Sequence, residues 1–160
     1  MKKFWSLLGL FGLDVLSKQA ALAWIPHVRW GEGYPFGGLG IFSWGVSCSL
    51  NTAFNTGAAW GFFPGHSGLL FGLRTLIIGG LVAWLFYRRE TKFALWLIVA
   101  GAVGNALDFC LYGHVIDFIH VTFWKKTFPI FNLADSYITL GAAWLFLSSK
   151  KYDPRFEPQK

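Results

Sequence analysis

Charged side chains are scarce in this sequence of 160 residues, where Asp, Glu, Lys and Arg together make up 14%. About a quarter of the residues in an ordinary soluble domain are charged, so the scarcity argues against that class. The chain has two cysteines, which are too few for a disulfide scaffold or a four-cysteine zinc site. Internal repeats and low-complexity stretches are also absent. The chain is too hydrophobic to be disordered, because disordered chains have low hydrophobicity. Its length suits one compact domain.

Apolar residues make up 54% of the chain and gather in four long runs. A helix needs about 20 such residues to cross the hydrocarbon core of a bilayer, and backbone groups in lipid must be hydrogen-bonded within their own segment. The sequence therefore predicts an all-α membrane protein, a four-transmembrane-helix bundle that forms one domain over residues 1–149. The expected helices cover residues 4–25, 67–87, 93–112 and 133–149.

Positive charge lies mainly at one set of helix ends. Nine of the 14 basic residues flank these ends, namely Lys2, Lys3, Arg88, Arg89, Lys92, Lys150, Lys151, Arg155 and Lys160. Because basic loops stay in the cytoplasm, both termini and the polar tail 150–160 are predicted to be cytoplasmic, with loops 26–66 and 113–132 outside. The net charge of +6 then reflects topology, and no nucleic-acid partner is expected.

The first apolar run has an alternative interpretation. Basic residues before it and alanines at 21 and 23 resemble a cleavable secretion signal. Asp14 and Lys18 would fit poorly into such a signal, so we expect a membrane span instead.

Within the loop 26–66, apolar and polar residues alternate between Phe42 and Asn51. A period of two is typical of a strand with one apolar face, and turn residues at 37–38 and 55–57 suggest a small β-sheet. We expect this sheet or loop element on the periplasmic side, at the bilayer interface, where Trp and Tyr are favoured.

Six charged residues lie within or next to the predicted helices, namely Asp14, Lys18, Arg74, Asp108, Asp117 and Asp135. A charge in the middle of a membrane costs about 2.5–3.5 kcal/mol on insertion scales, so each of these residues needs a structural or functional explanation. In the predicted topology all six fall in the middle or outer part of the bilayer. This clustering predicts a polar site near the non-cytoplasmic surface.

Two helices carry polar residues at helical spacing. Asp14 and Lys18 stand four residues apart and share a face, so a structural ion pair is the plain interpretation. One stripe of the third helix carries Gly101, Gly104, Asn105 and Asp108. Small residues let a neighbouring helix approach closely, which accounts for the glycines but not for the carboxylate.

Asp117 and Asp135 lie in contrasting surroundings. Asn132 and Asp135 match the two ends of a capping box at a helix N-terminus, which favours an ionised Asp135, and a plain helix cap is the alternative interpretation. Asp117 stands within an apolar stretch, where desolvation would raise its pKa. Two carboxyl groups in such different environments suit acid–base chemistry, and in one site they would titrate as a coupled pair.

Five short blocks resemble the lipoprotein signal peptidase (signal peptidase II) family of bacterial membrane aspartic peptidases. The blocks are DVLSK at 14–18, NTGAA at 55–59, GAVGNALD at 101–108, VIDF at 115–118 and FNLADS at 131–136. One block alone would be weak, but five in order, in a match over roughly residues 4–149, are specific. The resemblance implies an inner-membrane endopeptidase that removes signal peptides from diacylglyceryl-modified prolipoproteins, cleaving before the lipidated Cys.

At the matching positions the resemblance implies that Asp117 and Asp135 form the catalytic pair. Active-site support or substrate binding falls on Asn55, Asn105, Asn132, Asp108, Asp14 and Lys18. One ionised carboxylate would take a proton from water, while the other, protonated, would donate one to the substrate carbonyl oxygen.

Two residues depart from the family pattern. Phe109 follows Asp108 where the family commonly has Arg, and Trp60 replaces a usual Phe. The missing Arg is associated with substrate or inhibitor contacts, so the departure affects substrate positioning more than the catalytic pair. Arg74, which is also expected near the outer surface, is a candidate to compensate.

Three other functions remain open. His114, Asp117 and His120 stand three residues apart and could form a metal trio, but the resembled family uses no metal, and neither metal nor cofactor is expected. A small membrane transporter or proton-relay protein would also place acids in the membrane, although here they do not reach the inner face. The third is a non-catalytic member of the family, because Phe109 departs from the family pattern.

The expected partners are prolipoprotein substrates with diacylglyceryl-modified signal peptides and membrane phospholipid, and the chain is predicted to be a monomer. Cys48 and Cys110 both fall on the oxidising side, where a disulfide can form, although buried apolar roles are preferred.

Overall fold

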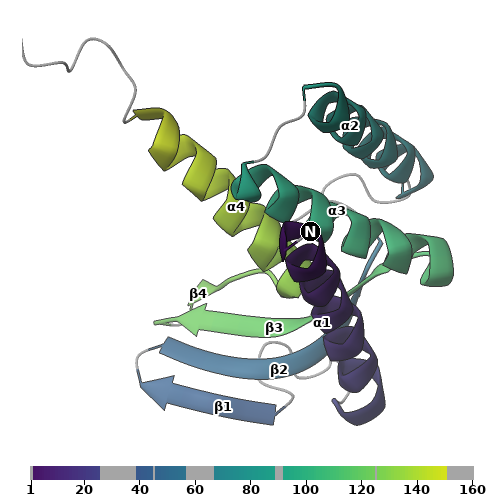
Figure 1. Cartoon of the computed structure of the whole chain (residues 1–160). Helices are drawn as coiled ribbons and strands as arrows, with labels where there is room; N and C mark the ends of the chain where they lie inside the picture. The colour runs from purple at the N-terminus through teal and green to yellow at the C-terminus, as the bar shows by residue number, and fades with distance from the viewer. Residues whose placement is uncertain are drawn as a thin grey trace, which may run out of the picture.

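A computed structural model describes residues 2–25, 39–44, 46–56, 67–88, 92–124 and 126–150 (Figure 1). The helices in these residues are α1 (Lys2–Trp24), α2 (Ser67–Tyr87), α3 (Phe93–Tyr112) and α4 (Leu133–Lys150). Their ends lie within two residues of the ends expected from the apolar runs. The tail 151–160 and the turn expected at 37–38 lie outside the described residues.

The strands form one antiparallel sheet in the order β1-β2-β3-β4. They are β1 (Leu39–Trp44), β2 (Val46–Asn55), β3 (Val115–Phe123) and β4 (Lys126–Thr127). The prediction of one strand from Phe42 to Asn51 was wrong, because the alternating segment is divided between β1 and β2, with Trp44 opposite Val46. A period of two gives no sign of a reversal of chain direction. The loop 113–132, to which the sequence assigned no element, contributes the other two strands.

A β-bulge sets the register between β2 and β3. Leu50 pairs with Ile119 and Ala53 pairs with Asp117, so two residues of β2 face one residue of β3. In an unbroken register Asn55 would lie on the face opposite Asp117, because a slip of one residue turns every following side chain over. With the bulge, Asn55 and Asp117 share one face of the sheet.

Helix α3 is central to the helical layer. It packs against α1 and α4, whereas α2 packs against α3 alone among the described elements, and the sheet lies across the ends of α1, α3 and α4 (Figure 1). Helices α3 and α4 approach closely at glycines: a Cβ at Gly141 would lie 2.6 Å from the carbonyl oxygen of Ala94. A Cβ at Gly104 would lie 2.7 Å from Asp14 Oδ2. The predicted stripe on α3 therefore does form a close helix interface.

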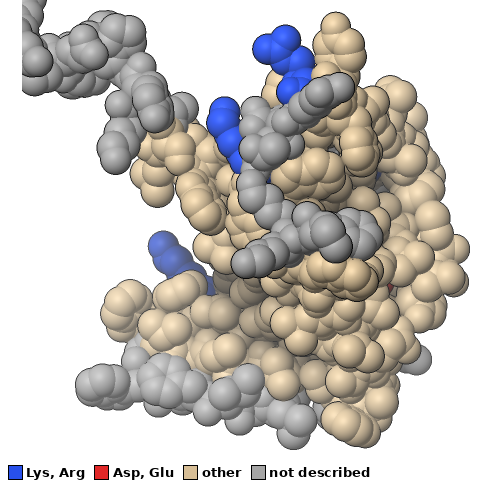
Figure 2. All heavy atoms as spheres, viewed as in Figure 1, with Lys and Arg blue, Asp and Glu red and all other residues tan. Residues whose placement is uncertain are grey.

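The surface of the helices is suited to lipid. Three helical segments are long and apolar enough to cross a membrane, Trp5–Trp24, Gly68–Tyr87 and Phe93–Tyr112, and the apolar part of α4 is shorter. Large apolar side chains are exposed on them, including Leu16 (69%) and Leu76 (73%). Figure 2 shows that the described charged side chains are few on this face of the molecule. Exposed apolar area of this extent marks a lipid-facing surface, so the chain is a multi-pass membrane protein.

Candidate active site

Helix α4 begins with a capping box. The side-chain oxygen of Asn132 accepts a hydrogen bond from the backbone N–H of Asp135 at 2.9 Å. In return, Asp135 Oδ2 accepts one from the backbone N–H of Asn132 at 3.3 Å. These reciprocal bonds confirm the predicted cap, and they hold the Asp135 carboxyl at the start of the helix.

The same residue also reaches the other predicted carboxyl. Asn132 Nδ2 donates to Asp117 Oδ1 on β3 at 2.7 Å. Asn132 thus donates to both carboxyl groups, from its side chain to Asp117 and from its backbone to Asp135. The start of α4 and the first residues of β3 are thereby joined in one site, as the sequence predicted for these two residues.

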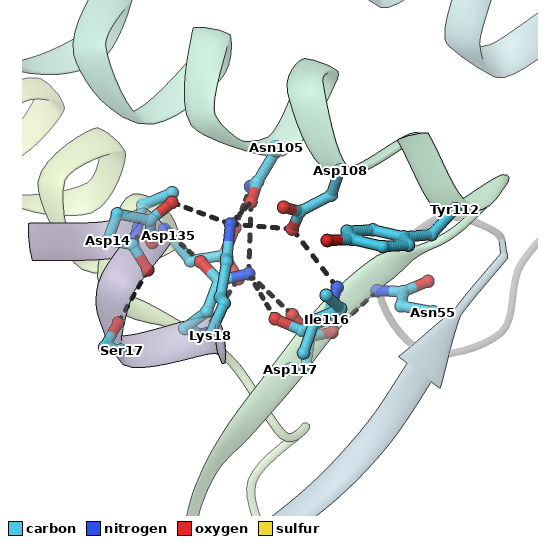
Figure 3. A network of polar contacts seen from close by, with 12 residues as sticks. Asp14, Ser17, Lys18, Asn55, Asn105, Asp108, Tyr112, Ile116, Asp117 and Asp135 are labelled. Atoms are coloured by element: carbon cyan, nitrogen blue, oxygen red, sulfur yellow. Dashed lines mark hydrogen bonds and ion pairs between the residues drawn. The ribbon is translucent and has the colours of Figure 1, made fainter. Parts of the chain in front are cut away.

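Two further amides complete the surroundings of the pair (Figure 3). Asn55 Nδ2, placed on this face by the bulge in β2, donates to Asp117 Oδ2 at 3.1 Å. Asn105 Nδ2 on α3 donates to Asp135 Oδ1 at 2.8 Å. Each oxygen of both carboxyl groups therefore accepts a hydrogen bond from an amide N–H.

Asp117 differs from an ordinary surface carboxyl. Its side chain is buried, and burial, followed by the nearby charge of Asp135, raises its pKa to about 8. The hydrogen bonds from Asn55 and Asn132 and the charge of Lys18 act in the opposite direction but are smaller. At neutral pH Asp117 accordingly carries a proton, which makes it a potential acid.

Lys18 is the centre of a second polar group beside the pair. Its side chain is fully buried, and Nζ lies 2.8 Å from Asp14 Oδ2 and 2.8 Å from Asp108 Oδ2. Nζ also donates to Asn105 Oδ1 at 3.0 Å. The predicted ion pair between Asp14 and Lys18 is confirmed, and it is part of a larger cluster that joins α1 to α3. Three acceptors match the three N–H groups of an ammonium.

Both carboxylates of this cluster also hold backbone near the candidate catalytic pair. Asp14 Oδ1 accepts a hydrogen bond from the backbone N–H of Ala134 at 2.9 Å, at the start of α4. Asp108 Oδ2 accepts one from the backbone N–H of Ile116 at 3.3 Å, next to Asp117 on β3. The cluster around Lys18 therefore positions the two segments that carry Asp117 and Asp135.

The orientation of the Asn105 amide follows from its neighbours. Its oxygen accepts hydrogen bonds from Lys18 Nζ and from Asn132 Nδ2, at 3.0 Å each. Both neighbours are donors, so the Nδ2 group must be the end that faces Asp135. A donor to that carboxylate is the arrangement that stabilises its charge.

Two residues linked to substrate positioning, Arg74 and Phe109, lie on α2 and α3. Arg74 lies exposed on α2, and its part in substrate binding stays a prediction. Phe109, which stands where the family commonly has Arg, stacks on Phe71 of α2, with ring centroids 4.6 Å apart.

His114 and His120 do not converge on Asp117. His114 packs against the ring of Phe54 at 4.3 Å, and His120 Nδ1 lies 3.4 Å from Ser49 Oγ. Within the described parts of the chain, no three His, Cys, Asp or Glu residues meet as a possible metal site. Cys48 and Cys110 are both free thiols.

Sequence reasoning missed one polar contact at the rim of the site. Gln19 Nε2 on α1 donates to the hydroxyl of Tyr112 on α3 at 2.8 Å. The sequence did contain a signal for this contact, because both residues are polar groups in the outer parts of predicted spans, where polar groups usually pair with one another. The contact ties the end of α3 to α1, close to the Lys18 cluster.

The chain resembles known proteins along nearly its whole length. A family model described as "Signal peptidase (SPase) II" matches residues 6–151. A lipoprotein signal peptidase of Chlamydia pneumoniae is 43% identical over 124 residues, covering 74% of this chain and 73% of that protein. A lipoprotein signal peptidase of Azoarcus sp. strain BH72 is 37% identical over 161 residues, covering 94% of this chain and 85% of that protein.

Two solved structures share the fold. Both are described as bacterial membrane enzymes studied by the in meso method. One has a TM-score of 0.76 at 24% identity and covers 99% of this chain and 93% of that chain. The other has a TM-score of 0.73 at 25% identity and covers 95% of this chain and 94% of that chain.

Proposed function

The chain belongs to the signal peptidase II family and is an aspartic peptidase, and on that premise we propose that Asp117 and Asp135 are its catalytic pair. Their substrate is a diacylglyceryl-modified prolipoprotein, and they hydrolyse the peptide bond before the lipidated Cys. The observation that supports this most is the placement of Asn132, which donates a hydrogen bond to both carboxyl groups. An amide shared in this way holds the two groups as one unit.

The first step uses the two carboxyl groups in different protonation states. Asp117 starts protonated, because burial raises its pKa to about 8, and Asp135 starts ionised at the N-terminus of α4. A water molecule attacks the carbonyl carbon of the substrate, and Asp135 takes one of its protons. Asp117 gives its proton to the carbonyl oxygen, which forms a neutral gem-diol and leaves Asp117 ionised.

The second step reverses these roles. The bond between carbon and nitrogen breaks, and Asp135 passes the proton that it took from water to the leaving amine. Asp117 recovers a proton from one hydroxyl of the gem-diol as the carbonyl re-forms. Both carboxyl groups are then in their starting states, so the cycle consumes only one water molecule.

The cluster around Lys18 supports this chemistry without touching the substrate. Lys18 fixes Asn105, and Asp14 and Asp108 hold the backbone of Ala134 and Ile116. Catalysis by preorganised groups depends on rigid placement, and four helix and strand segments tied by one buried ammonium provide it. Lys18, Asp14 and Asp108 are positioning residues in our proposal, and the family resemblance implies the same role for Asp14 and Lys18.

The proposal includes an orientation in the bacterial inner membrane. The positive charge at one set of helix ends supports cytoplasmic termini and a cytoplasmic tail 150–160. Helix α4 then serves as the fourth span, and the sheet and the catalytic pair lie toward the periplasm, where a translocated precursor presents its cleavage site. The chain acts as a monomer surrounded by phospholipid.

The test is substitution of each carboxyl by an amide of the same shape. Asp117→Asn and Asp135→Asn should each reduce turnover of a diacylglyceryl-modified precursor by at least about 10⁴-fold. Conversion is followed as a decrease in precursor size on a gel. Asp117→Asn resembles the protonated side chain, so its unfolding temperature should stay near that of the unmodified chain. Near-normal turnover in either variant would refute the pair.

A further inference from the structure

A cavity of about 320 Å³ lies between α2 and α3, on the side of α3 away from the catalytic pair. We call it the α2–α3 crevice, and its lining includes Thr75, Gly79, Val103, Ala106, Leu107 and Cys110. Nearly all of its surface is apolar. The hydroxyl of Thr75 donates to the carbonyl oxygen of Phe71 at 2.9 Å, so the one hydroxyl in the lining is already bonded. Such a lining suits hydrocarbon and offers a polar ligand nothing to bind.

Aromatic contacts at both ends keep the two helices apart. Toward one end Phe71 stacks on Phe109, with ring centroids 4.6 Å apart, and toward the other Phe86 meets Trp96 edge to face at 5.8 Å. Between these contacts a Cβ added at Gly79 would meet no atom within 4 Å. Gly79 therefore does not serve close helix packing, as glycines in membrane helices often do, but leaves space.

The crevice and the candidate catalytic site lie on opposite sides of the same turns of α3. Ala106 and Leu107 of the lining stand directly between Asn105 and Asp108 of the polar site in the sequence. An α-helix with its side chains is about 10–12 Å across, so one helix separates the two sites. From Val103 to Cys110 the lining extends along α3 by about 10 Å at 1.5 Å per residue.

We propose that the α2–α3 crevice binds one fatty-acyl chain of the diacylglyceryl group on the substrate. The proposal rests on the proposed function, which places a lipidated Cys beside the catalytic pair. An acyl chain attached there must enter the bilayer next to α3, and the crevice is an apolar slot at that depth. Binding there would fix the lipidated residue against the carboxyl pair.

Filling the crevice tests the proposal. Gly79→Leu places a side chain into the slot, and Gly80→Leu is the matched control, because a Cβ there also meets nothing within 4 Å and Gly80 is not part of the lining. With a precursor carrying long acyl chains, Gly79→Leu should raise KM about fivefold and leave kcat unchanged, since lost packing contacts weaken binding only. A precursor with short chains should be cleaved equally by both variants and by the unmodified chain. An unchanged KM, or an equal loss with short chains, would overturn the proposal.

A binding experiment separates this proposal from the proposed function. Asp117→Asn protein is mixed with a precursor whose acyl chain carries a photoreactive diazirine, and the labelled residues are mapped by mass spectrometry. Labels should fall on residues that line the α2–α3 crevice, whether or not the unmodified chain cleaves this precursor. Labels elsewhere would overturn the crevice even if cleavage is normal.

A second arm identifies the source of the chain. Phosphatidylglycerol with the same photoreactive chain should label the crevice less when unlabelled precursor is added in excess. If excess precursor does not reduce labelling by the phospholipid, the crevice holds a resident lipid. That result would overturn the assignment of the crevice to the substrate.

Discussion

The two sides of helix α3 use small residues in opposite ways. On the side toward α1 and α4, Gly104 brings the backbone so close that a Cβ would lie 2.7 Å from Asp14 Oδ2. On the other side, Gly79 belongs to the neighbouring helix α2 and faces open space. The first side contains buried charges and amides joined by hydrogen bonds, and the second contains an apolar crevice held open by aromatic pairs.

The difference reflects what holds helices together in lipid. Apolar surface gains little by leaving lipid for a protein interface, so close packing and polar bonds must supply the attraction. The side around Lys18 has both, and α1, α3 and α4 are joined to each other there. Helix α2 contacts α3 alone among the described elements, and a Cβ added at Gly79 or Gly80 along its middle would meet nothing within 4 Å. One side is therefore built for rigidity, and the other has room for a ligand.

Removing the central charge should affect the polar side most. Lys18→Met leaves Asp14 and Asp108 buried side by side without a cation, and breaking a buried ion pair in this way costs about 3–5 kcal/mol. Thermal unfolding in detergent should show a large loss of stability. The matched control is Lys126→Met, an exposed lysine on β4, which should change stability by less than about 0.5 kcal/mol. Equal behaviour of the two variants would contradict a structural role for the cluster.

A methyl group added on each side of α3 should have opposite effects on stability. Gly104→Ala forces a Cβ against Asp14 Oδ2 and should destabilise the chain by about 1–3 kcal/mol. Gly79→Ala meets nothing and removes a flexible helix residue, so it should be neutral or stabilise by up to about 1 kcal/mol. Unfolding of the two variants under the same conditions measures the contrast. A loss of stability in Gly79→Ala would show that the crevice is smaller than described.

Much of the polar side could be predicted from local sequence. The apolar runs gave the helix ends, and the spacing of Asn132 and Asp135 predicted the capping box, because both signals depend on residues within a few positions of each other. The pairing of Asp14 with Lys18 is equally local, since the two stand one helical turn apart.

Contacts between distant segments could not be read in the same way. Lys18 also pairs with Asp108, which stands ninety positions further along the chain, and no local pattern links the two. The bulge that brings Asn55 to Asp117 depends on how β2 pairs with β3, and the apolar stretch from Val115 has no alternation that marks a strand.

The polar side should respond to pH, whereas the crevice should not. Since the pKa of Asp117 is raised to about 8, its proton is present below that pH and is lost above it, so kcat/KM should fall about tenfold per pH unit beyond 8. The unfolded chain ionises Asp117 near pH 4, so the free energy of unfolding should also decline between about pH 4 and 8. Labelling of the crevice by the photoreactive precursor should stay constant from pH 6 to 9. Activity that is still rising at pH 9 would contradict a protonated Asp117.

The smallest expected effect concerns the aromatic contact that closes one end of the crevice. The stacked rings of Phe71 and Phe109 should contribute about 0.5–1.5 kcal/mol beyond the area that they bury. A double-mutant cycle with Phe71→Leu, Phe109→Leu and the double variant isolates this pairwise energy in thermal unfolding. Turnover of a short-chain precursor should change less than twofold in all three, because neither ring bonds to the residues around Lys18. A coupling energy near zero would mean that α2 is held by other contacts, and that the position at which the family commonly has Arg does not set the width of the crevice.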